Sequence, residues 1–459
     1  MLATIAVLLA LTSSSRQQGT QTKLAASLGV PFEVQQNWAE SSPWFPLTEY
    51  TKLPDGCEIT QLQRHGARFP TTAVNDSIVT ALNKLKSAQT FTDPRLAFVP
   101  GFVYDLGTND LIPFGAQESF DSGEQAFHRY SSLISKDNIP FVRSDSSTRV
   151  VMSANNWTAG FAAASGGKFN PVLSVVLFSS VSCLPHPVLE WSHQSSKGND
   201  TLEDGSCPNA GNSDNQTLAW VETFAPPITK MLNRGAPGAN LTDLDTVALM
   251  EICPFHTLAK EKPSPFCGLF ETVPNAFPNF EYIGDLDKFY GTGYGQPLGP
   301  VQGVGWVNEL IARLTNTPVE DHTQTNSTLD SSPITFPFNR TMYADFSHDD
   351  QLNAIMSAMG LFKQPGVEPL DPTRPNKRRI WRASTMVPFA SRVVVERLDC
   401  TTSRGRFKVS TPSVRVLVNQ EIQPLSFCDA NDHGVCTLDA FVKSQSFARS
   451  GGNFAKCFD

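Results

Sequence analysis

Strand-like patterns lie toward both ends of the chain, and helical patterns fill its middle. Residues 57–63, CEITQLQ, alternate between apolar and polar side chains, and residues 392–400 and 413–420 are strand-like as well. Residues 169–178, FNPVLSVVLF, are apolar enough for a buried strand. From about residue 217 to residue 315, apolar side chains recur with helical spacing. The pattern therefore predicts an α/β core with a helical insert.

These patterns suggest a short leader followed by one discontinuous folded unit. We assign the leader to residues 1–17 and the folded unit to residues 18–459. The expected α/β core covers about residues 45–75, 138–190 and 335–459, and the helical segments cover about residues 76–137 and 195–334.

The leader has the features of a secretory signal peptide. Leu2–Leu11 is an apolar run that is too short to cross a membrane and is followed by small residues. A short buried strand is the alternative interpretation. No later segment is long and apolar enough to span a bilayer, and the C-terminus lacks the apolar tail of a lipid-anchor signal.

Two further features agree with export from the cell. The chain has nine cysteines but no C-x-x-C pair, which favours disulfides over a zinc site, and the odd number leaves one cysteine unpaired. It also has many N-x-S/T glycosylation sequons. They start at Asn75, Asn156, Asn199, Asn215, Asn240, Asn326 and Asn339.

The overall charge narrows the range of partners. The formal net charge is −8, which counts against general nucleic-acid binding because such binding needs a basic surface. A basic pocket within an acidic protein is still compatible with these numbers.

Such a pocket is indicated by RHGARFP, residues 64–70, which follows the first predicted strand. Arg64 and Arg68 carry planar forks of donors that suit a phosphate group, and in a helical turn they would share a face. His65 lies between them, where neighbouring cations keep its imidazole neutral and nucleophilic. Gly66 allows close approach of the backbone. By average residue usage, the pattern R-H-G-x-R-x-P occurs by chance in about one chain in ten thousand of this length.

A second motif, FSHDD at residues 346–350, also follows a predicted strand. Phosphoryl transfer to a histidine needs neutralisation of the phosphate charge and a proton for the leaving oxygen. His348 can supply the first and Asp349, in its acid form, the second. Asp345 and Asp350 are the rival carboxylates.

A third stretch, VRSDSSTRV at residues 142–150, offers Arg143 and Arg149. An arginine that follows a strand in a serine-rich turn could complete a phosphate cage. A salt-bridged surface arginine is an equally good interpretation.

Together these motifs resemble the histidine acid phosphatases, and among them the secreted fungal and yeast phytases. The similarity extends through SPWFPL, IPFGAQE, TLEDGSC, LGPVQGVGWVNELIARLT and YADFSHDD, and so covers nearly the whole mature chain. The resemblance implies that His65 is the nucleophile that forms a phosphohistidine, and that Asp349 protonates the leaving alcohol. It also implies that Arg64, Arg68, Arg143 and His348 grip the phosphate, with no metal or other cofactor taking part.

The resemblance also implies a fold and a disulfide pattern. The family fold, which is phosphoglycerate-mutase-like, has a large α/β domain with a central, mostly parallel sheet and a smaller, mainly helical domain. The implied disulfides are Cys57–Cys400, Cys207–Cys457, Cys253–Cys267 and Cys428–Cys436, with Cys183 left free.

The expected function is therefore that of an extracellular acid phosphatase acting on phosphate esters, with phytate as the substrate. We expect secretion to the medium, the cell wall or the periplasmic space, no nucleic-acid or membrane partner, and an acidic pH optimum; a homo-oligomer is compatible with the sequence. A broad acid phosphatase and a non-catalytic wall glycoprotein are the alternatives.

Family members often have a lysine-rich stretch after the first motif, whereas this chain has TAVNDSIV there, and only Lys84 and Lys86 follow.

Overall fold

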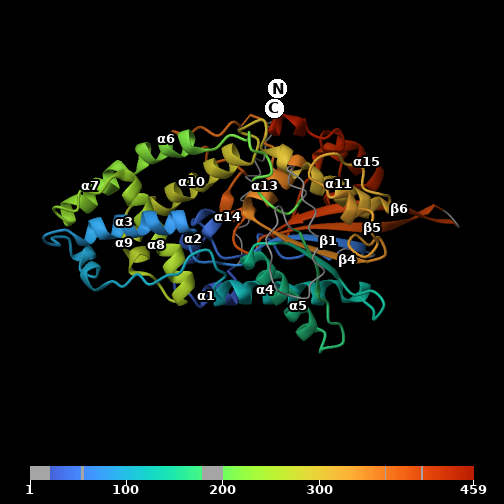
Figure 1. Ribbon diagram of the computed structural model, residues 1–459, viewed down its shortest axis with the longest axis horizontal. Coiled ribbons are helices and arrows are strands. Elements are labelled where there is room, and N and C mark those ends of the chain that lie inside the picture. The colour runs from blue at the N-terminus through green and yellow to red at the C-terminus, as the bar shows by residue number, and fades with distance from the viewer. Residues whose placement is uncertain (1–20, 53–55, 178–199, 367, 405–406) are drawn as a thin grey trace, which may run out of the picture.

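The computed structural model describes residues 21–52, 56–177, 200–366, 368–404 and 407–459, apart from the side chains of residues 399–410 (Figure 1). At its centre, eight strands form one sheet in the order β3-β2-β4-β1-β5-β6-β7, with β8 beside β6. The strands are β1 Gly56–Arg64, β2 Phe141–Asp145, β3 Leu173–Leu177, β4 Met342–Ser347, β5 Arg392–Arg404, β6 Phe407–Val418, β7 Glu421–Ile422 and β8 Val435–Thr437.

The sheet is parallel in one half and antiparallel in the other. Strands β3, β2, β4 and β1 run parallel, whereas β5 and β6 are each antiparallel to their neighbours. In the register, Arg64 at the end of β1 pairs with Ser347 at the end of β4, and Ser144 of β2 pairs with Phe346. Three parallel strands therefore end side by side, and the predicted α/β fold with parallel core strands is confirmed.

Helices cover both faces of this sheet. On one face, Ile59, Met342 and Phe346 pack with buried side chains of α4 (Pro113–Tyr130) and α5 (Thr148–Ala164). Figure 1 shows α4 and α5 below the sheet and α11 (Val304–Thr315), α13 (Asp349–Ala358) and α15 (Leu438–Ser444) above it. Helix α4 lies within the range that we expected for the helical insert, but it packs on the sheet because its buried stripe, which includes Ala126 and Tyr130, faces the strands.

The other helices form a second body to the left of the sheet in Figure 1. There α3 packs against α8, and α10 packs against α6. The helices of this body are α3 Thr72–Lys86, α6 Asp214–Phe224, α7 Pro226–Gly235, α8 Asp243–Lys260, α9 Pro265–Glu271 and α10 Ala276–Gly291.

Short helices connect these parts. The α-helical ones are α1 Lys23–Ala26, α2 Phe32–Gln35, α12 Ser327–Asp330, α14 Ala383–Met386 and α16 Ser446–Arg449. The 3-10 turns are η1 Ala39–Ser41, η2 Pro94–Leu96, η3 Val99–Gly101, η4 Ser131–Leu133, η5 Pro300–Gly303, η6 Ser426–Cys428 and η7 Phe454–Cys457.

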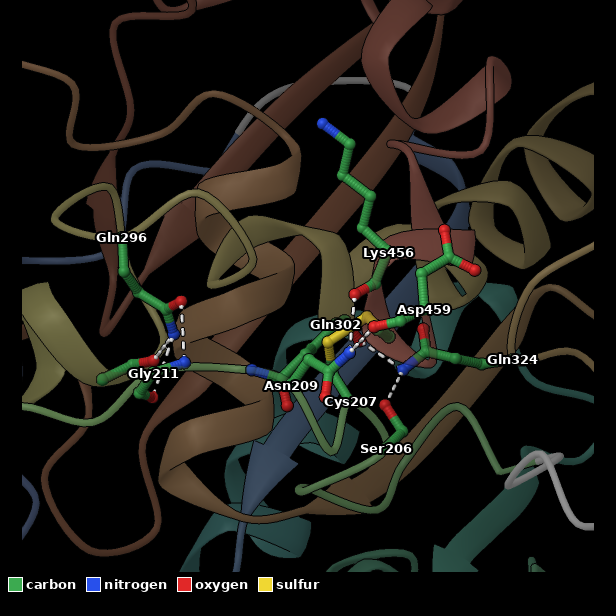
Figure 2. The surroundings of a disulfide bond; sticks show 11 residues. Ser206, Cys207, Asn209, Gly211, Gln296, Gln302, Gln324, Lys456 and Asp459 are labelled. Carbon is green, nitrogen blue, oxygen red and sulfur yellow. Dashed lines mark hydrogen bonds between the residues drawn. A yellow bond between two sulfur atoms is a disulfide. The ribbon is translucent and has the colours of Figure 1, made fainter.

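Three of the four expected disulfides are present: Cys207–Cys457, Cys253–Cys267 and Cys428–Cys436. The first joins two segments that are 250 residues apart. Figure 2 shows its surroundings, where the Asn209 amide donates to the carbonyls of Lys456, at 3.2 Å, and Asp459, at 2.8 Å. The Cys207–Cys457 disulfide thus anchors the C-terminus of the chain to the segment that precedes α6. Cys57 lies on β1, but the side chain of Cys400 lies outside the described residues, as does Cys183, so the fourth pairing stays a prediction.

The segment that begins at residue 200 is buried where it starts. Asp200, Thr201 and Leu202 are buried, because the Oγ1 of Thr201 donates to Glu309 and the carbonyl of Leu202 accepts from Ser347.

The predicted glycosylation sites differ in exposure. Asn215, Asn240 and Asn339 are exposed, and Asn75, Asn156 and Asn326 are half-buried. Asn199 and the predicted leader, residues 1–17, lie outside the described residues. Within the part of the chain that the structure describes, no helix has the length and apolar character needed to cross a membrane.

Candidate active site

The first and second motifs meet where β1 and β4 end. The backbone N–H of His65 donates to the carbonyl of Ser347 at 3.0 Å, which extends the strand pairing by one residue. His348 is the N-cap residue of α13, and Asp349 is the first residue of that helix. The rings of His65 and His348 therefore lie 5.5 Å apart between their centroids. The two motifs are far apart in the sequence, but they meet because their parallel strands end at the same edge of the sheet.

His65 is buried and has one ring nitrogen available for attack. Its Nδ1 lies 2.8 Å from the carbonyl oxygen of Gly66, and a carbonyl can only accept, so Nδ1 carries the proton. The lone pair then resides on Nε2. Burial lowers the pKa of His65 well below its usual value, and the charge of Arg64 lowers it further. The imidazole is therefore a neutral nucleophile even in acid, as the sequence predicts.

The backbone of the first motif is held by two helices of the α/β part. The Glu118 carboxylate on α4 accepts from the N–H of Ala67 at 2.8 Å, and Ser153 Oγ on α5 accepts from the N–H of Gly66 at 3.0 Å. Gly66 is needed because a Cβ there would lie 2.0 Å from the carbonyl oxygen of Gly115. Close packing of α4 thus places the motif.

Arg64 and Arg68 do not share a helical face, because the motif continues from β1 as a loop and not as a helical turn. Both guanidinium groups nevertheless approach the ring of Phe389, at 4.5 Å and 5.9 Å from its centroid. Arg64 is fully buried and donates to the carbonyls of Glu40 and Val387. Burial, and then the charge of Arg64, lowers the pKa of Arg68 to about 10, so Arg68 stays cationic below neutral pH.

Arg143 and Arg149 are placed very differently. Arg143, on β2, is buried, and its guanidinium donates to both oxygens of Asp345 at 2.9 Å and to Glu309 on α11 at 2.6 Å. Asp345 is also bound by Arg313 at 2.8 Å. Arg143 is therefore neutralised within a buried ion cluster beneath the strand ends.

Arg149, on α5, lies in the site instead. Its NH2 group is 3.2 Å from Nδ1 of His348, and its positive charge contributes to the lowered pKa of His65. The opposite nitrogen of His348, Nε2, lies 2.9 Å from Oδ2 of Asp145, the last residue of β2. The structure thus brings Arg149, rather than Arg143, to the two histidines.

Asp349 is surrounded by cations. Its Oδ1 lies 3.3 Å from Arg64, and its Oδ2 lies 2.8 Å from Nζ of Lys288 on α10. Burial alone would raise the pKa of Asp349, but the charges of Arg64 and Lys288 hold it well below the usual value. Lys288 also contacts Asp350 at 2.8 Å, and burial raises the pKa of Asp350 to about 7. At mildly acidic pH, Asp349 is therefore ionised in the free protein, whereas Asp350 is mostly protonated.

Lys288 could not be found from the sequence, since GDLDKFYG carries no motif that marks it. It is buried, at 4% exposure, and it reaches the site from the helical body. Lys84 and Lys86, the two lysines that follow the first motif, are engaged elsewhere: Lys84 pairs with Asp245 at 2.7 Å, and Lys86 donates to the carbonyl of Phe102.

The arrangement provides a neutral imidazole with a free nitrogen, four nearby cations and one carboxyl group. The cations are Arg64, Arg68, Arg149 and Lys288. Such a set can bind a phosphate group, accept it on a nitrogen and exchange a proton with the departing oxygen.

Comparisons with known proteins agree with this chemistry. A model of the histidine phosphatase superfamily (branch 2) matches residues 59–419. Phytase A of Aspergillus awamori is 37% identical over 97% of this chain and 95% of its own length. Phytase A of Aspergillus fumigatus is 38% identical over 92% of this chain and 90% of its own length.

Solved structures show the same fold. The phytase from D. castellii superposes with a TM-score of 0.71 at 17% identity, covering 96% of this chain and 93% of its own. The multiple inositol polyphosphate phosphatase of Bifidobacterium longum, in complex with inositol hexasulfate, has a TM-score of 0.61 at 16% identity, covering 88% of this chain and 96% of its own.

Proposed function

The chain belongs to the histidine phosphatase superfamily (branch 2), and on that premise we propose that it is a secreted acid phosphomonoesterase that hydrolyses phytate. The observation that carries the proposal is His65, a buried neutral imidazole with Nε2 free, which lies among Arg64, Arg68 and Arg149. The identity with curated phytases over most of the chain favours phytate, myo-inositol hexakisphosphate, as the substrate.

The reaction proceeds in two displacements. In the first, Nε2 of His65 attacks phosphorus, the P–N bond forms, and the bond from phosphorus to the alcohol oxygen breaks while Asp349 gives that oxygen a proton. In the second, water attacks phosphorus, its proton passes to Asp349, and the P–N bond breaks to release inorganic phosphate.

Arg64, Arg68, Arg149 and His348 hold the phosphate in this scheme. Arg149 takes the place that we had given to Arg143, because the donors of Arg143 are engaged by Asp345 and Glu309. A guanidinium with buried carboxylate partners has little left to offer a substrate, whereas Arg149 faces the histidine pair.

Asp349 needs a proton before it can donate one, and the free enzyme does not favour this form. Arg64 and Lys288 hold its pKa well below the usual value. A bound phosphate brings negative charge to the same cations, which raises the proton affinity of Asp349 when it is needed. An acidic optimum follows, because low pH supplies the proton and the arginines keep their charge.

A second function is favoured by the absence of the lysine-rich stretch: a broad acid phosphatase of the same mechanism. Lys84 and Lys86 are bound elsewhere, and Lys288 is engaged by Asp349 and Asp350, so these three lysines offer no free charge for a further phosphate of a polyphosphorylated substrate.

The test is a comparison of kcat/KM on phytate and on p-nitrophenyl phosphate at acidic pH. We expect a preference for phytate; a strong preference for the small ester would instead establish the broad phosphatase. In the His65→Ala variant both activities should fall at least about 10⁴-fold, since the nucleophile is gone. Full activity in that variant would refute the site.

The proposed location is outside the cell, either in the medium or in the cell wall or periplasmic space. Three disulfides support it, because such bonds persist in oxidising compartments. Detection of the protein only in the cytosol of its source cells would contradict this.

A further inference from the structure

We propose that Asp145 is a positioning residue for His348: it holds the Nε2–H of the ring, so that Nδ1 is the atom presented to the phosphate, and Glu203 donates a hydrogen bond to Asp145. This deepens the proposed function and rests on it, since Nδ1 has a phosphate to meet only if the site binds one.

The contact between Asp145 and His348 is direct and buried. Nε2 of His348 lies 2.9 Å from Oδ2 of Asp145, and the same oxygen accepts the N–H of Ser147 at 2.8 Å. His348 is 2% exposed and Asp145 is 0% exposed. Asp145 ends β2 and His348 precedes α13, so two packed elements hold the pair in place.

Hydrogen-bond chemistry assigns the tautomer. The Asp145 carboxylate can only accept, so Nε2 carries a proton. The guanidinium of Arg149, 3.2 Å from Nδ1, can only donate, so Nδ1 accepts in this phosphate-free state. His348 is then a neutral ring whose two nitrogens are both engaged.

Phosphate binding reverses the role of Nδ1. Phosphate oxygens compete for the donors of Arg149, and Nδ1 can contact them only as a donor. A phosphate monoester in its monoanionic form supplies the proton: its O–H bond breaks, an N–H bond forms at Nδ1, and a dianion lies beside an imidazolium. A buried carboxylate on the far nitrogen stabilises that imidazolium and prevents the ring from turning.

Glu203 completes the arrangement. One atom each of Asp145, Glu203 and His348 lie within 4.8 Å of one another. The side chains of Glu203 and Asp145 are hydrogen-bonded, which requires a proton on one of the two carboxyl groups. Asp145 already accepts from His348 and Ser147, so the proton resides on Glu203. In agreement, burial, followed by the hydrogen bond with Asp145, raises the pKa of Glu203 to about 11. The other charged or titratable groups around the pair are Asp200, Asp204, Arg143, Arg149 and His65.

Three variants test these roles. Asp145→Asn keeps the size of the side chain but removes its charge, so we expect kcat/KM to fall about 100-fold and inhibition by inorganic phosphate to weaken. Asp137→Asn, an exposed aspartate ahead of β2, is the matched control and should behave as the wild type. Glu203→Gln replaces one hydrogen-bond donor with another and should retain kcat/KM within about threefold.

A direct measurement covers the case in which Asp145→Asn does not fold. In wild-type protein with ¹⁵N-labelled histidine, and with the His348 signal assigned by His348→Gln, we expect only Nε2 to be protonated without phosphate. Addition of inorganic phosphate should protonate Nδ1 as well, and this does not require turnover.

The proposal is overturned if phosphate leaves Nδ1 unprotonated, if folded Asp145→Asn keeps full kcat/KM, or if Glu203→Gln is as impaired as Asp145→Asn. A normal phosphate response in a protein that hydrolyses neither phytate nor p-nitrophenyl phosphate would refute the proposed function and leave the role of Asp145 standing.

Discussion

Nζ of Lys288 lies 2.8 Å from Oδ2 of Asp349, and this ion pair joins α10 of the helical body to the first residue of α13 beside the sheet. The pair matters for catalysis because it is one of two contacts that keep Asp349 ionised in the free enzyme. The helical body therefore influences the protonation of a group in the α/β body.

Removal of the charge of Lys288 should extend activity toward higher pH. In Lys288→Met, Asp349 loses a cation that lowers its pKa, so the pKa rises and the protonated form persists to higher pH. We expect the alkaline limb of the kcat profile to move up by about one pH unit, with a larger KM for phytate. Lys84→Met, which removes a lysine paired with Asp245 outside the site, is the control, and an identical shift there would refute the explanation.

Replacement of Asp349 should affect substrates according to their leaving groups. Inositol oxygens need a proton as they depart, whereas p-nitrophenolate leaves readily without one. In Asp349→Asn we expect kcat to fall about 10³-fold on phytate but no more than about tenfold on p-nitrophenyl phosphate. Steady-state kinetics on both substrates measure this, and an equal loss on the two would argue against a proton-donating role.

Substitution of Arg143 should mainly lower stability, whereas substitution of Arg149 should mainly lower activity. Arg143→Met leaves Asp345 and Glu309 buried with fewer partners, and loss of one member of a buried ion cluster costs about 3–5 kcal/mol of unfolding free energy. Arg149→Met should leave unfolding nearly unchanged but lower kcat/KM about 100-fold. Urea unfolding and steady-state kinetics of both variants test this difference. If Arg143→Met alone lost activity, without a loss of stability, Arg143 and not Arg149 would be the phosphate-binding arginine.

The protein should be more stable at pH 5 than at pH 8. Burial raises the pKa of Glu118 to about 7 and that of Glu251 to about 8, so both carboxyls favour the protonated form in the folded state. A carboxyl whose pKa is raised by folding is fully compatible with the fold below its unfolded pKa of about 4.5, and it destabilises the fold increasingly as pH rises toward the folded pKa. Other carboxyls raised in this way are Glu58, Glu281, Asp330 and Asp350.

The opposite limit lies at low pH. Asp345 has a lowered pKa: burial alone would raise it, but the charges of Arg143 and Arg313 outweigh burial. Its stabilising contribution is therefore present above its unfolded pKa of about 4 and is lost progressively as the pH falls below that value. Thermal unfolding between pH 3 and pH 8 should therefore give a maximum near pH 5. A melting temperature that rises from pH 5 to pH 8 would contradict this account.

Much of the site could be predicted because it is local in sequence. Arg64, His65 and Arg68 lie within five positions after a strand, and His348 and Asp349 are adjacent after another. Where such strands are parallel, their ends meet, so the fold class and these motifs together bring the two histidines close. The sequence could not distinguish Arg143 from Arg149, because two arginines in one stretch satisfy the same local rule.

The sequence by itself determined which chemistry is available, namely an imidazole, arginines and a carboxyl group at the ends of predicted strands. The tertiary structure decided which of these groups are free to act. Arg143 faces α11 and is neutralised by two carboxylates. Arg149 is the second residue of α5 and meets His348, and Lys288 reaches the site from the helical body. The physical reason is that the effect of a charge depends on its neighbours: a cation already paired in a buried cluster cannot serve a substrate, and those partners come from elements that are remote in sequence.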